Sequence, residues 1–551
     1  MAIFYDCKQD IIKDLQKRVD DKALERSNFD ILKKFVEKSD SLTEAIAVAE
    51  LGTTYKRTGF HFDKRLEKIG DTVRFLKKNN ELSFSQDAPI THKLIIGDNY
   101  HALLNLLVEY KGRIDVIYID PPYGKDNMGE FAKTNYDNAI TRDNLLSMLY
   151  PRLLLAKQLL SDSGVIFCSI DDKNQAYVEC LFDEIFGEEN FISNSILVNN
   201  RGGRDYGGIA KQHEYILIYS KTEDYELNSI EEMDKQFQYK DEQGGFNLME
   251  LRNRNVKFND KNRPNLCYPF YVNPNNSDKN GLFEISLEEK DGFVKVMPAK
   301  SQGIQTVWRW GKEEKSRENL NREIFGKVNQ NGGYMIVQKY RKTAKMQRSI
   351  WDDKEFVNER GTEILKELFD GNYFDYPKSV FTIKRILELA TNENSLILDF
   401  FAGSGTTGQA VLELNKEDGR KRKFILVQLP EDLDEALKNS DSEEIIRNQI
   451  ELCDRYNRPH RLSEITAERL RRIMTGKCYD GTSDFKWIKE NKALGGNLEV
   501  TEITNYANYK GEIFEEIDET LYGKEKFANI KEKIEWICEN FENTQKFLEE
   551  K

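Results

Sequence analysis

The sequence predicts an α/β fold whose mostly parallel sheet is divided along the chain by a long insertion. Short apolar segments of β-prone residues alternate with segments of helical periodicity, first over residues 93–219 and again over 378–428. Between them, residues 221–371 are rich in Asn, Gly, Asp and Pro and lack this alternation. Strands that alternate with helices usually form a parallel sheet with helices on both faces.

The elements follow from this periodicity. In the first half we expect, in chain order, a strand and turn at Lys93–Asn99, a helix around 103–107, a strand at Ile114–Asp120, a helix at Leu145–Leu160, a strand at Val165–Ile170, a helix at Asn174–Phe186 and a strand at Tyr215–Tyr219. In the second half we expect a helix at Lys378–Ala390, a strand at Ser395–Asp399, a helix at Thr406–Leu414 and a strand at Phe424–Gln428.

At 551 residues the chain is too long for a single hydrophobic core. We expect five segments, which are a helical arm (1–88), a first α/β half (89–225), an inserted domain (226–372), a second α/β half (373–432) and a helical, acidic region (433–551).

The net charge of −13 would by itself argue against a nucleic-acid partner. It is an average over the chain, however, and basic residues are concentrated in one segment. Residues 306–350 contain eleven basic and four acidic residues, a net charge of +7. Such a segment in an acidic protein is typical of phosphate contact, and a solvated surface is the plain alternative. The DNA-binding candidates are Arg309, Lys339, Arg341, Lys342 and Lys345. Trp308 and Trp310 lie in the same segment, although buried tryptophans are commoner than base-stacking ones.

Seven scattered cysteines without a CxxC pair and five dispersed histidines predict neither a disulfide framework nor a protein-bound metal. No segment approaches 18 consecutive apolar residues, and the first residues lack a basic region followed by an apolar one. We therefore expect a cytoplasmic protein that does not associate with membranes.

Asp120 closes a predicted strand and is followed by two prolines and an aromatic residue. Because proline cannot donate to a strand ladder, the strand ends here, and Pro121 and Pro122 form a rigid turn. Open α/β sheets bind ligands at the carboxyl ends of their strands. The Asp120 carboxylate and the Tyr123 ring together suit a planar base that carries an exocyclic amine. An ordinary turn after a strand is the plain alternative.

A glycine-rich segment follows the predicted strand that ends at Asp399 and opens a helix. Its glycines let a ligand approach the backbone at a helix N-terminus. They also satisfy GxGxxG, which alone is a weak signature of dinucleotide binding. In that interpretation an acidic residue ends the next strand about 20 residues on, whereas here Gln428 ends it and Glu431 lies slightly beyond. A turn that serves only helix packing is a further alternative.

Together the two turns resemble those of amino-methyltransferases that depend on S-adenosylmethionine. Asp-Pro-Pro-Tyr at 120–123 precedes Phe-Ala-Gly-Ser-Gly-Thr at 401–406, an order that resembles the β class of DNA adenine-N6 methyltransferases. Further segments look like the modification (Mod) subunit of type III restriction–modification systems, over a region from Leu94 to Ile473. These segments are Asn262–Leu266, Trp308–Trp310, Tyr376–Lys378, Phe424–Leu429 and Glu468–Arg472.

The resemblance implies a Rossmann-like, S-adenosylmethionine-dependent methyltransferase sheet, circularly permuted as in the β class. In it, residues 89–225 form the catalytic half, 226–372 the target recognition domain and 373–432 the cofactor-binding half, with helical regions at both ends. The implied activity is methylation of adenine N6 in duplex DNA after the base is flipped out. The implied partners are DNA, a second copy of the chain in a homodimer and an ATP-dependent restriction (Res) subunit.

The resemblance also implies roles for individual residues. The catalytic residues are Asp120, Pro121, Pro122 and Tyr123. The residues that bind S-adenosylmethionine are Asp399, Phe400, Phe401, Ala402, Gly403, Ser404, Gly405, Thr406, Lys378, Gln428 and Asp98. For Asp98 a helix cap is the alternative, and for Lys378 a solvated helix start.

Three other functions stay open at this point. N4-cytosine methylation also proceeds through an exocyclic amine, although Ser is more frequent than Asp at the position of Asp120 in such enzymes. An adenine methyltransferase without a restriction partner has the same motifs. A nicotinamide-dependent oxidoreductase is the distant alternative, and it rests on GxGxxG alone.

Overall fold

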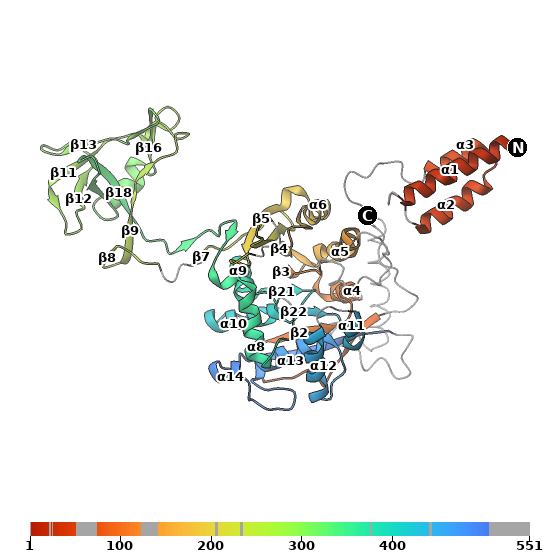
Figure 1. Ribbon diagram of the computed structural model, residues 1–551. Helices are drawn as coiled ribbons and strands as arrows, with labels where there is room; N and C mark the ends of the chain where they lie inside the picture. Colours follow the sequence, from red (N-terminus) through yellow and green to blue (C-terminus); the bar gives the residue numbers. More distant parts are fainter. Residues whose placement is uncertain are drawn as a thin grey trace, which may run out of the picture. The chain divides into compact units, whose positions relative to one another are not determined.

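Figure 1 shows the chain in a computed structural model, which describes residues 2–20, 24, 26–50, 74–122, 141–203, 208–231, 235–374, 377–439 and 443–505. The chain divides into two compact units. The larger unit contains Met1–Asn228 and Arg348–Lys551, and the smaller unit contains Ser229–Gln347. The chain therefore leaves the larger unit and returns to it, as an inserted domain requires.

The larger unit is built on a ten-stranded sheet in the order β1-β23-β2-β22-β21-β3-β4-β6-β5-β20. In this order the strands are Arg74–Lys78, Asn497–Asn505, Thr91–Ile96, Lys423–Gln428, Leu396–Asp399, Ile114–Ile119, Leu160–Ile170, His213–Ser220, Phe191–Val198 and Ile350–Trp351. The run from β23 to β4 is parallel, while β1 and β6 are antiparallel to their neighbours. The predicted class, a mostly parallel α/β sheet, is confirmed.

The helices between these strands cover both faces of the sheet. They are α4 (Asn99–Tyr110), α5 (Thr141–Leu159), α6 (Gln175–Phe186), α9 (Val380–Ala390) and α10 (Thr406–Asp418). Figure 1 shows α4, α5 and α6 together on one face and α9 and α10 on the other. The central strands are nearly continuous apolar runs because both of their faces are buried, as in β3, where five of six residues are buried.

Two strands at one side of the sheet were not expected from the sequence. The prediction of helix throughout residues 1–88 and 433–551 is wrong for β1 and β23, which pair with each other. In β23, Leu498 and Val500 alternate with polar residues and are buried, a strand pattern that the surrounding acidic, helical sequence obscures. The remainder of these regions, where described, is largely helical. It contains α1 (Ala2–Asp20), α2 (Arg26–Lys38), α3 (Leu42–Glu50), α11 (Leu433–Asn439), α12 (Glu443–Arg455), α13 (Leu462–Thr475) and α14 (Lys486–Glu490).

Helices α1 to α3 have a small core of their own. Leu15 of α1 and Phe29 and Val36 of α2 are buried in this core. Burial of apolar residues on one side of each helix is typical of amphipathic helices. Helix α8 (Asn358–Phe369) also belongs to the larger unit and follows β20. The predicted insertion at 226–372 therefore extends beyond the compact smaller unit, which ends at Gln347.

The smaller unit is built from β-strands. Its seven-stranded sheet has the order β13-β11-β12-β17-β18-β9-β8. These strands are Val294–Val296, Phe270–Ser277, Phe283–Ser286, Ile324–Val328, Tyr334–Tyr340, Gly244–Glu250 and Tyr239–Asp241. Three further pairs are β10 (Arg252–Asn253) with β16 (Val307–Trp308), β14 (Lys300–Ser301) with β15 (Ile304–Gln305), and β7 (Ile230–Glu231) with β19 (Ala344–Lys345). Trp308 is at the centre of its core, where its indole N–H donates to the carbonyl of Tyr268.

Among the described residues, no helix combines the length and the apolar character that crossing a membrane requires.

The contact between Gly97 and β23 tests whether the unexpected strand is part of the folded sheet. Gly97 follows β2 with a φ of +154°, and a Cβ atom there would fall on the side chain of Ile503. We expect Gly97→Ala to lower the free energy of unfolding by about 1–3 kcal/mol, measured by urea denaturation. The control is Gly481→Ala, whose φ of +82° is also positive but whose Cβ meets no atom within 4 Å.

The double variant Gly97→Ala/Ile503→Ala is expected to lose less stability than the sum of the two single losses, because the second change removes the clash. Additive losses would contradict the placement of β23 beside β2.

Candidate active site

Four neighbouring parallel strands, β2, β22, β21 and β3, end at the same edge of the large sheet. Asp98, Gln428, Asp399 and Asp120 are the last residues of these strands or follow them by one or two positions. The four strand-end residues singled out from the sequence thus belong to one edge. In open α/β sheets this edge is where ligands bind.

Asp399 begins the turn that joins β21 to α10 and is buried there. One of its carboxylate oxygens accepts a hydrogen bond from the backbone N–H of Phe401 at 3.0 Å, and the other accepts one from the Thr407 hydroxyl at 2.6 Å. Burial raises the pKa of Asp399 to about 7, and the nearby Asp120 carboxylate adds to this rise, while the two hydrogen bonds oppose it. The side chain is thus a buried acid that a cationic ligand would ionise.

The glycines of this turn have two different tasks. Gly403 and Gly405 adopt φ values of +53° and +83°, which glycine tolerates without a steric penalty. A Cβ atom on Gly403 would meet only the Phe401 carbonyl oxygen, at 3.9 Å, so space beside the backbone is open. A Cβ atom on Gly408 would approach Leu470 of α13 to 2.7 Å. The first two glycines therefore shape a surface that a ligand can approach, and the third allows two helices to pack.

Helix α13 contacts the glycine turn through Arg469, whose side chain is completely buried. Its guanidinium donates to the Ser404 hydroxyl at 2.6 Å, the Thr406 hydroxyl at 3.0 Å and the Gln409 side-chain oxygen at 2.8 Å. Thr466 of the same helix donates to the Gly403 carbonyl at 2.7 Å. Burial lowers the pKa of Arg469 to about 9, so its hydrogen bonds offset a considerable desolvation cost.

Residues of α4 and α5 also contact the glycine turn. The Asn99 side chain donates to the Phe400 carbonyl at 2.8 Å, and its oxygen accepts a hydrogen bond from the buried Arg152. Arg152 also forms an ion pair with Asp98 at 3.1 Å. Asp98 is the N-cap of α4 and accepts from the backbone N–H groups of Tyr100 and His101. The helix-cap interpretation of Asp98 is confirmed, and its role toward a cofactor stays a prediction.

The second turn begins where β3 ends. Asp120 Oδ1 accepts from Lys378 Nζ at 3.1 Å, and Lys378 also pairs with Glu214 Oε2 at 3.0 Å. Lys378 and Glu214 are buried, whereas Asp120 is about a quarter exposed, at 28%. Pro121 and Pro122 follow in the described chain, and Tyr123 lies outside the described residues.

Burial raises the pKa of Glu214, and the neighbouring Lys378 opposes this rise. The three side chains come from segments far apart along the chain, the end of β3, the start of β6 and the segment before α9. One cation between two carboxylates leaves the cluster with a net negative charge when all three are ionised. A positively charged reaction centre next to Asp120 would be stabilised by this charge.

Gln428 is buried at the end of β22, and its side-chain N–H donates to the Leu429 carbonyl at 3.1 Å. Its own carbonyl accepts from the backbone N–H of Gly97 at 2.9 Å. Its proposed contact with a ribose stays a prediction, as does that of the half-buried Glu431.

Sequence reasoning did not assign a role to several residues that build this edge. Arg469 belongs to a segment noted only for its resemblance, and no local pattern marked Asn99, Arg152 or Glu214 as partners of the two turns. Buried arginines and a buried glutamate are unusual enough to attract attention, but their burial is visible only in three dimensions.

Two of the five basic candidates in the smaller unit form ion pairs within it. Arg341 pairs with Asp241 at 2.6 Å and with Glu323 at 3.3 Å, and Lys339 pairs with Asp241 at 2.7 Å. The Arg341 guanidinium holds the pKa of Asp241 well below its usual range. Contact of these two cations with DNA would compete with these ion pairs, so their DNA role stays a prediction, as do those of the other three candidates.

No group of three or more His, Cys, Asp and Glu side chains in the described part of the chain is arranged to hold a metal ion.

Comparisons with known proteins agree with this geometry. A family model described as DNA methylase matches residues 114–438, more than half of the chain. The type II methyltransferase M.KpnI of Klebsiella pneumoniae is 34% identical over 61% of this chain and 80% of its own length. Two type III Mod subunits, EcoPI of Escherichia phage P1 and StyLTI of Salmonella typhimurium, are 32% and 31% identical.

The chain spans only 57% and 64% of the lengths of these two Mod subunits, which cover 61% and 79% of this chain. Among solved structures, the PvuII DNA methyltransferase (cytosine-N4-specific) is similar over 72% of this chain and 96% of its own, with a TM-score of 0.34 and 10% identity. The M1.HpyAVI–SAM complex is similar over 65% and 98%, with a TM-score of 0.28 and 14% identity.

Replacing Arg469 tests whether α13 holds the glycine turn. We expect Arg469→Gln to lower the free energy of unfolding by about 1–3 kcal/mol, because the buried hydrogen bonds to the Ser404 and Thr406 hydroxyls are lost. The control is Arg471→Gln on the same helix, which removes the same charge from a partly exposed position. Equal losses for the two variants in urea denaturation would contradict this role.

The raised pKa of Asp399 predicts a dependence of stability on pH. The folded chain keeps a proton on this carboxyl up to about pH 7, whereas the unfolded chain releases it near its ordinary pKa of 3.8. Stability must therefore fall as the pH rises between these values, with a slope of up to about 1.4 kcal/mol per pH unit. We expect the free energy of unfolding of the wild type to fall relative to that of Asp399→Asn from pH 4.5 to 7.5. Parallel pH profiles would contradict the burial of an uncompensated carboxyl.

Proposed function

We propose that this chain, which belongs to the DNA methylase family, transfers a methyl group from S-adenosylmethionine to N6 of adenine in duplex DNA. We further propose that it is the modification and recognition subunit of a type III restriction–modification system. The two Mod relatives support this second step.

One observation carries the proposal. Strands β21 and β3 are direct neighbours, with Leu398 beside Ile117, so the glycine turn and the Asp-Pro-Pro turn leave the sheet next to each other. The effect of Asp120 on the pKa of Asp399 agrees with this proximity. A cofactor held at one turn and a base held at the other would bring the methyl donor and the accepting amine together. Such positioning is the main source of rate enhancement in a reaction of this kind.

The glycine turn fits S-adenosylmethionine. The open space beside Gly403 admits a ligand against the backbone, and Asp399 is a buried carboxyl without a cationic partner among the interactions described above. When bound, S-adenosylmethionine supplies a methyl group on a positively charged sulfur. Asp399 would be ionised by this charge, and the Phe400 to Gly405 backbone would line the methionine and sugar portions.

The Asp-Pro-Pro turn suits an exocyclic amine. An ionised carboxylate only accepts hydrogen bonds, so Asp120 accepts one from N6, and the Pro121 carbonyl accepts the second. Two acceptors draw the amine toward a tetrahedral shape and expose its lone pair for attack on the methyl carbon. The N6–methyl bond would form as the methyl–sulfur bond breaks, the neutral thioether S-adenosylhomocysteine would leave, and N6 would then lose one proton to solvent. The proposed role of Tyr123, which lies outside the described residues, is to stack on the flipped base. Such a contact is worth about 1–3 kcal/mol, against a flipping cost of a few kcal/mol.

The Lys378 cluster prepares Asp120 for this task. The ammonium group of Lys378 contacts one carboxylate oxygen of Asp120 at 3.1 Å and so fixes the orientation of that side chain. As the amine attacks, positive charge develops on N6, and the adjacent Asp120 carboxylate stabilises it. No covalent intermediate with the protein is needed.

We also propose that the protein acts in the cytoplasm, with DNA as its macromolecular ligand. By analogy with the Mod relatives we also propose a homodimer and association with an ATP-dependent Res subunit. Sedimentation of the purified chain and co-purification with the product of a neighbouring restriction gene test these two assemblies.

Loss of Asp120 is the direct test of the reaction. With tritiated S-adenosylmethionine and duplex DNA, we expect Asp120→Asn to lower kcat at least 100-fold, because the amide cannot replace a charged acceptor. The control is Asp162→Asn, an exposed acid on β4 with 86% of its side chain accessible. A nucleoside digest should show N6-methyladenine. Label recovered in N4-methylcytosine would show that the substrate base is cytosine and not adenine. The absence of any label in DNA would overturn the proposed function.

Lys378 has two proposed roles that one variant separates. If it binds the methionine carboxylate of the cofactor, Lys378→Met raises the Kd for S-adenosylhomocysteine. If it orients Asp120, as its 3.1 Å ion pair suggests, the variant lowers kcat more than 10-fold and leaves this Kd within twofold. We expect the second result, which calorimetry and single-turnover kinetics distinguish.

A further inference from the structure

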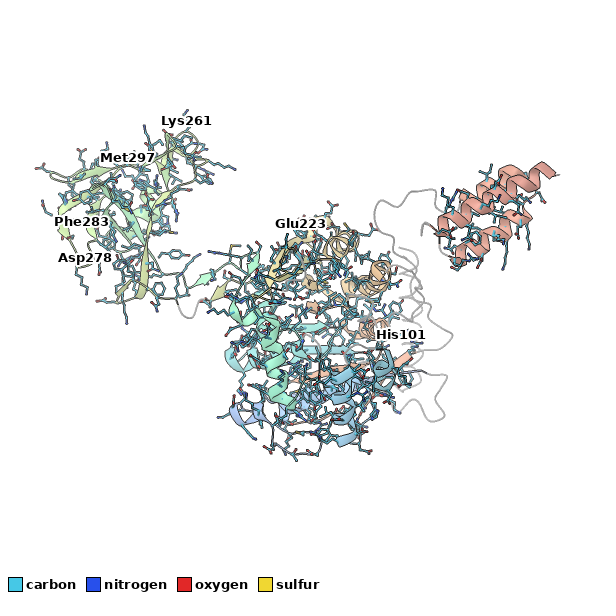
Figure 2. All side chains as sticks on the ribbon, viewed as in Figure 1. His101, Glu223, Lys261, Asp278, Phe283 and Met297 are labelled. Atoms are coloured by element: carbon cyan, nitrogen blue, oxygen red, sulfur yellow. The ribbon has the colours of Figure 1, made fainter. Side chains whose placement is uncertain are left out.

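An exposed loop of the smaller unit carries a net positive charge, and three of its four basic residues form no ion pair with a carboxylate within the described ranges. The loop, residues 254–263, joins β10 to a short 3-10 turn at Pro264–Leu266, and we call it the basic loop. Its basic residues are Arg254, Lys257, Lys261 and Arg263, against the single acid Asp260, a net charge of +3. All four basic side chains are exposed. Figure 2 shows Lys261 at the tip of the smaller unit.

The basic loop is held in shape by reciprocal hydrogen bonds between two asparagines. The Asn259 side-chain oxygen accepts from the backbone N–H groups of Lys261 and Asn262 at 3.1 and 3.3 Å. In return, the Asn262 side chain accepts from the backbone N–H of Asn259 at 3.0 Å and donates to the Lys257 carbonyl at 2.7 Å. Asparagine side chains that bond to nearby backbone stabilise turns in this way. These hydrogen bonds hold the backbone from which the cationic side chains project.

The basic loop is also anchored to the core of its own unit. Asn259 forms a β-bridge with Thr306, and the backbone N–H of Asp260 donates to the Gln305 carbonyl at 3.2 Å. These residues lead directly into β16, whose Trp308 is buried at the centre of the core. A partner that binds the loop is thus held by the folded unit and not by a detached segment.

The side chains of Lys257, Lys261 and Arg263 have no carboxylate partner within the described ranges, whereas Lys339 and Arg341 pair with Asp241. Cations that already have partners gain little from a phosphate, because the existing ion pairs must be broken first. Unpaired cations on a rigid loop release counterions when they meet a phosphate, which supplies most of the affinity of proteins for DNA.

Phe258 lies between these cations along the loop and is 39% exposed. Across the strand connection, Ile304 is 40% exposed next to Gln305, which binds the loop backbone. An aromatic ring held among cations is suited to contact a base or sugar once the phosphates are bound.

We propose that the basic loop is the element of the smaller unit that contacts duplex DNA, with Lys257, Lys261 and Arg263 on backbone phosphates and Phe258 against a base or sugar. This inference rests on the proposed function, because it names where the DNA substrate is held. The basic loop, and not Lys339 and Arg341, is then the main site of contact with DNA.

The test compares two triple variants with the same change in charge. The first is Lys257→Gln/Lys261→Gln/Arg263→Gln. The matched control is Lys279→Gln/Lys290→Gln/Lys295→Gln, which changes three exposed lysines of the same unit outside the loop. Binding of a fluorescent duplex that contains the methylated site is measured from 50 to 300 mM salt. Binding of S-adenosylhomocysteine and the melting temperature report whether each variant folds.

We expect the loop variant to bind the duplex at least 10-fold more weakly, and the slope of log K against log salt to become shallower by about 2–3, since each phosphate contact contributes about 0.9. The control variant should change affinity less than threefold. Asn259→Ala removes no charge, so it should weaken binding and leave the slope unchanged, and Phe258→Ala should behave in the same way.

The outcomes separate the two proposals. If the wild type binds and methylates the duplex and both triple variants lose the same affinity, the proposed role of the basic loop is overturned. The proposed methyltransferase function would be unaffected by this result. A wild type that neither binds nor methylates any duplex would overturn the proposed function itself.

Discussion

The parallel pairing of β21 with β3 is the constraint on which the site depends. This pairing sets Leu398 beside Ile117, so that the turns that follow the two strands emerge together at one edge of the sheet. The two strands are separated in sequence by the whole of the smaller unit, which leaves the sheet and returns to it. Any slip in the register of this pair would carry Asp399 away from Asp120 and separate the cofactor turn from the amine-binding turn.

Around this pairing, buried polar groups fix the shape of the glycine turn. Arg469 holds it from α13, and Asn99, supported by Arg152, holds it from the other side. Two fully buried guanidinium groups have a high desolvation cost, and their hydrogen bonds offset it only when every partner is in place. The result is a backbone that is ordered before a ligand arrives, so the ordering cost is met by folding and not by binding.

The sequence predicted those parts of the site that depend on local patterns. Asp399 and Asp120 were identified because apolar runs, glycines and prolines mark the ends of strands. Their pairing partners were not, because Glu214 and Arg469 approach the turns from distant segments. Lys378 was assigned to the cofactor, and its ion pair with Asp120 was not predicted. The strand β23 was missed for a related reason, since its alternating pattern lies within an acidic, helical region. Charge density pointed to Lys339 and Arg341, but only the structure shows that Asp241 already engages them.

A crystal structure of the chain with S-adenosylhomocysteine and duplex DNA is the most direct test of the central claim. The account predicts one adenine outside the duplex, with N6 within hydrogen-bond distance of Asp120 and the Pro121 carbonyl, and the cofactor sulfur facing that nitrogen from the Asp399 to Gly405 turn. A cofactor bound elsewhere, or a flipped base whose amine does not meet Asp120, would contradict it.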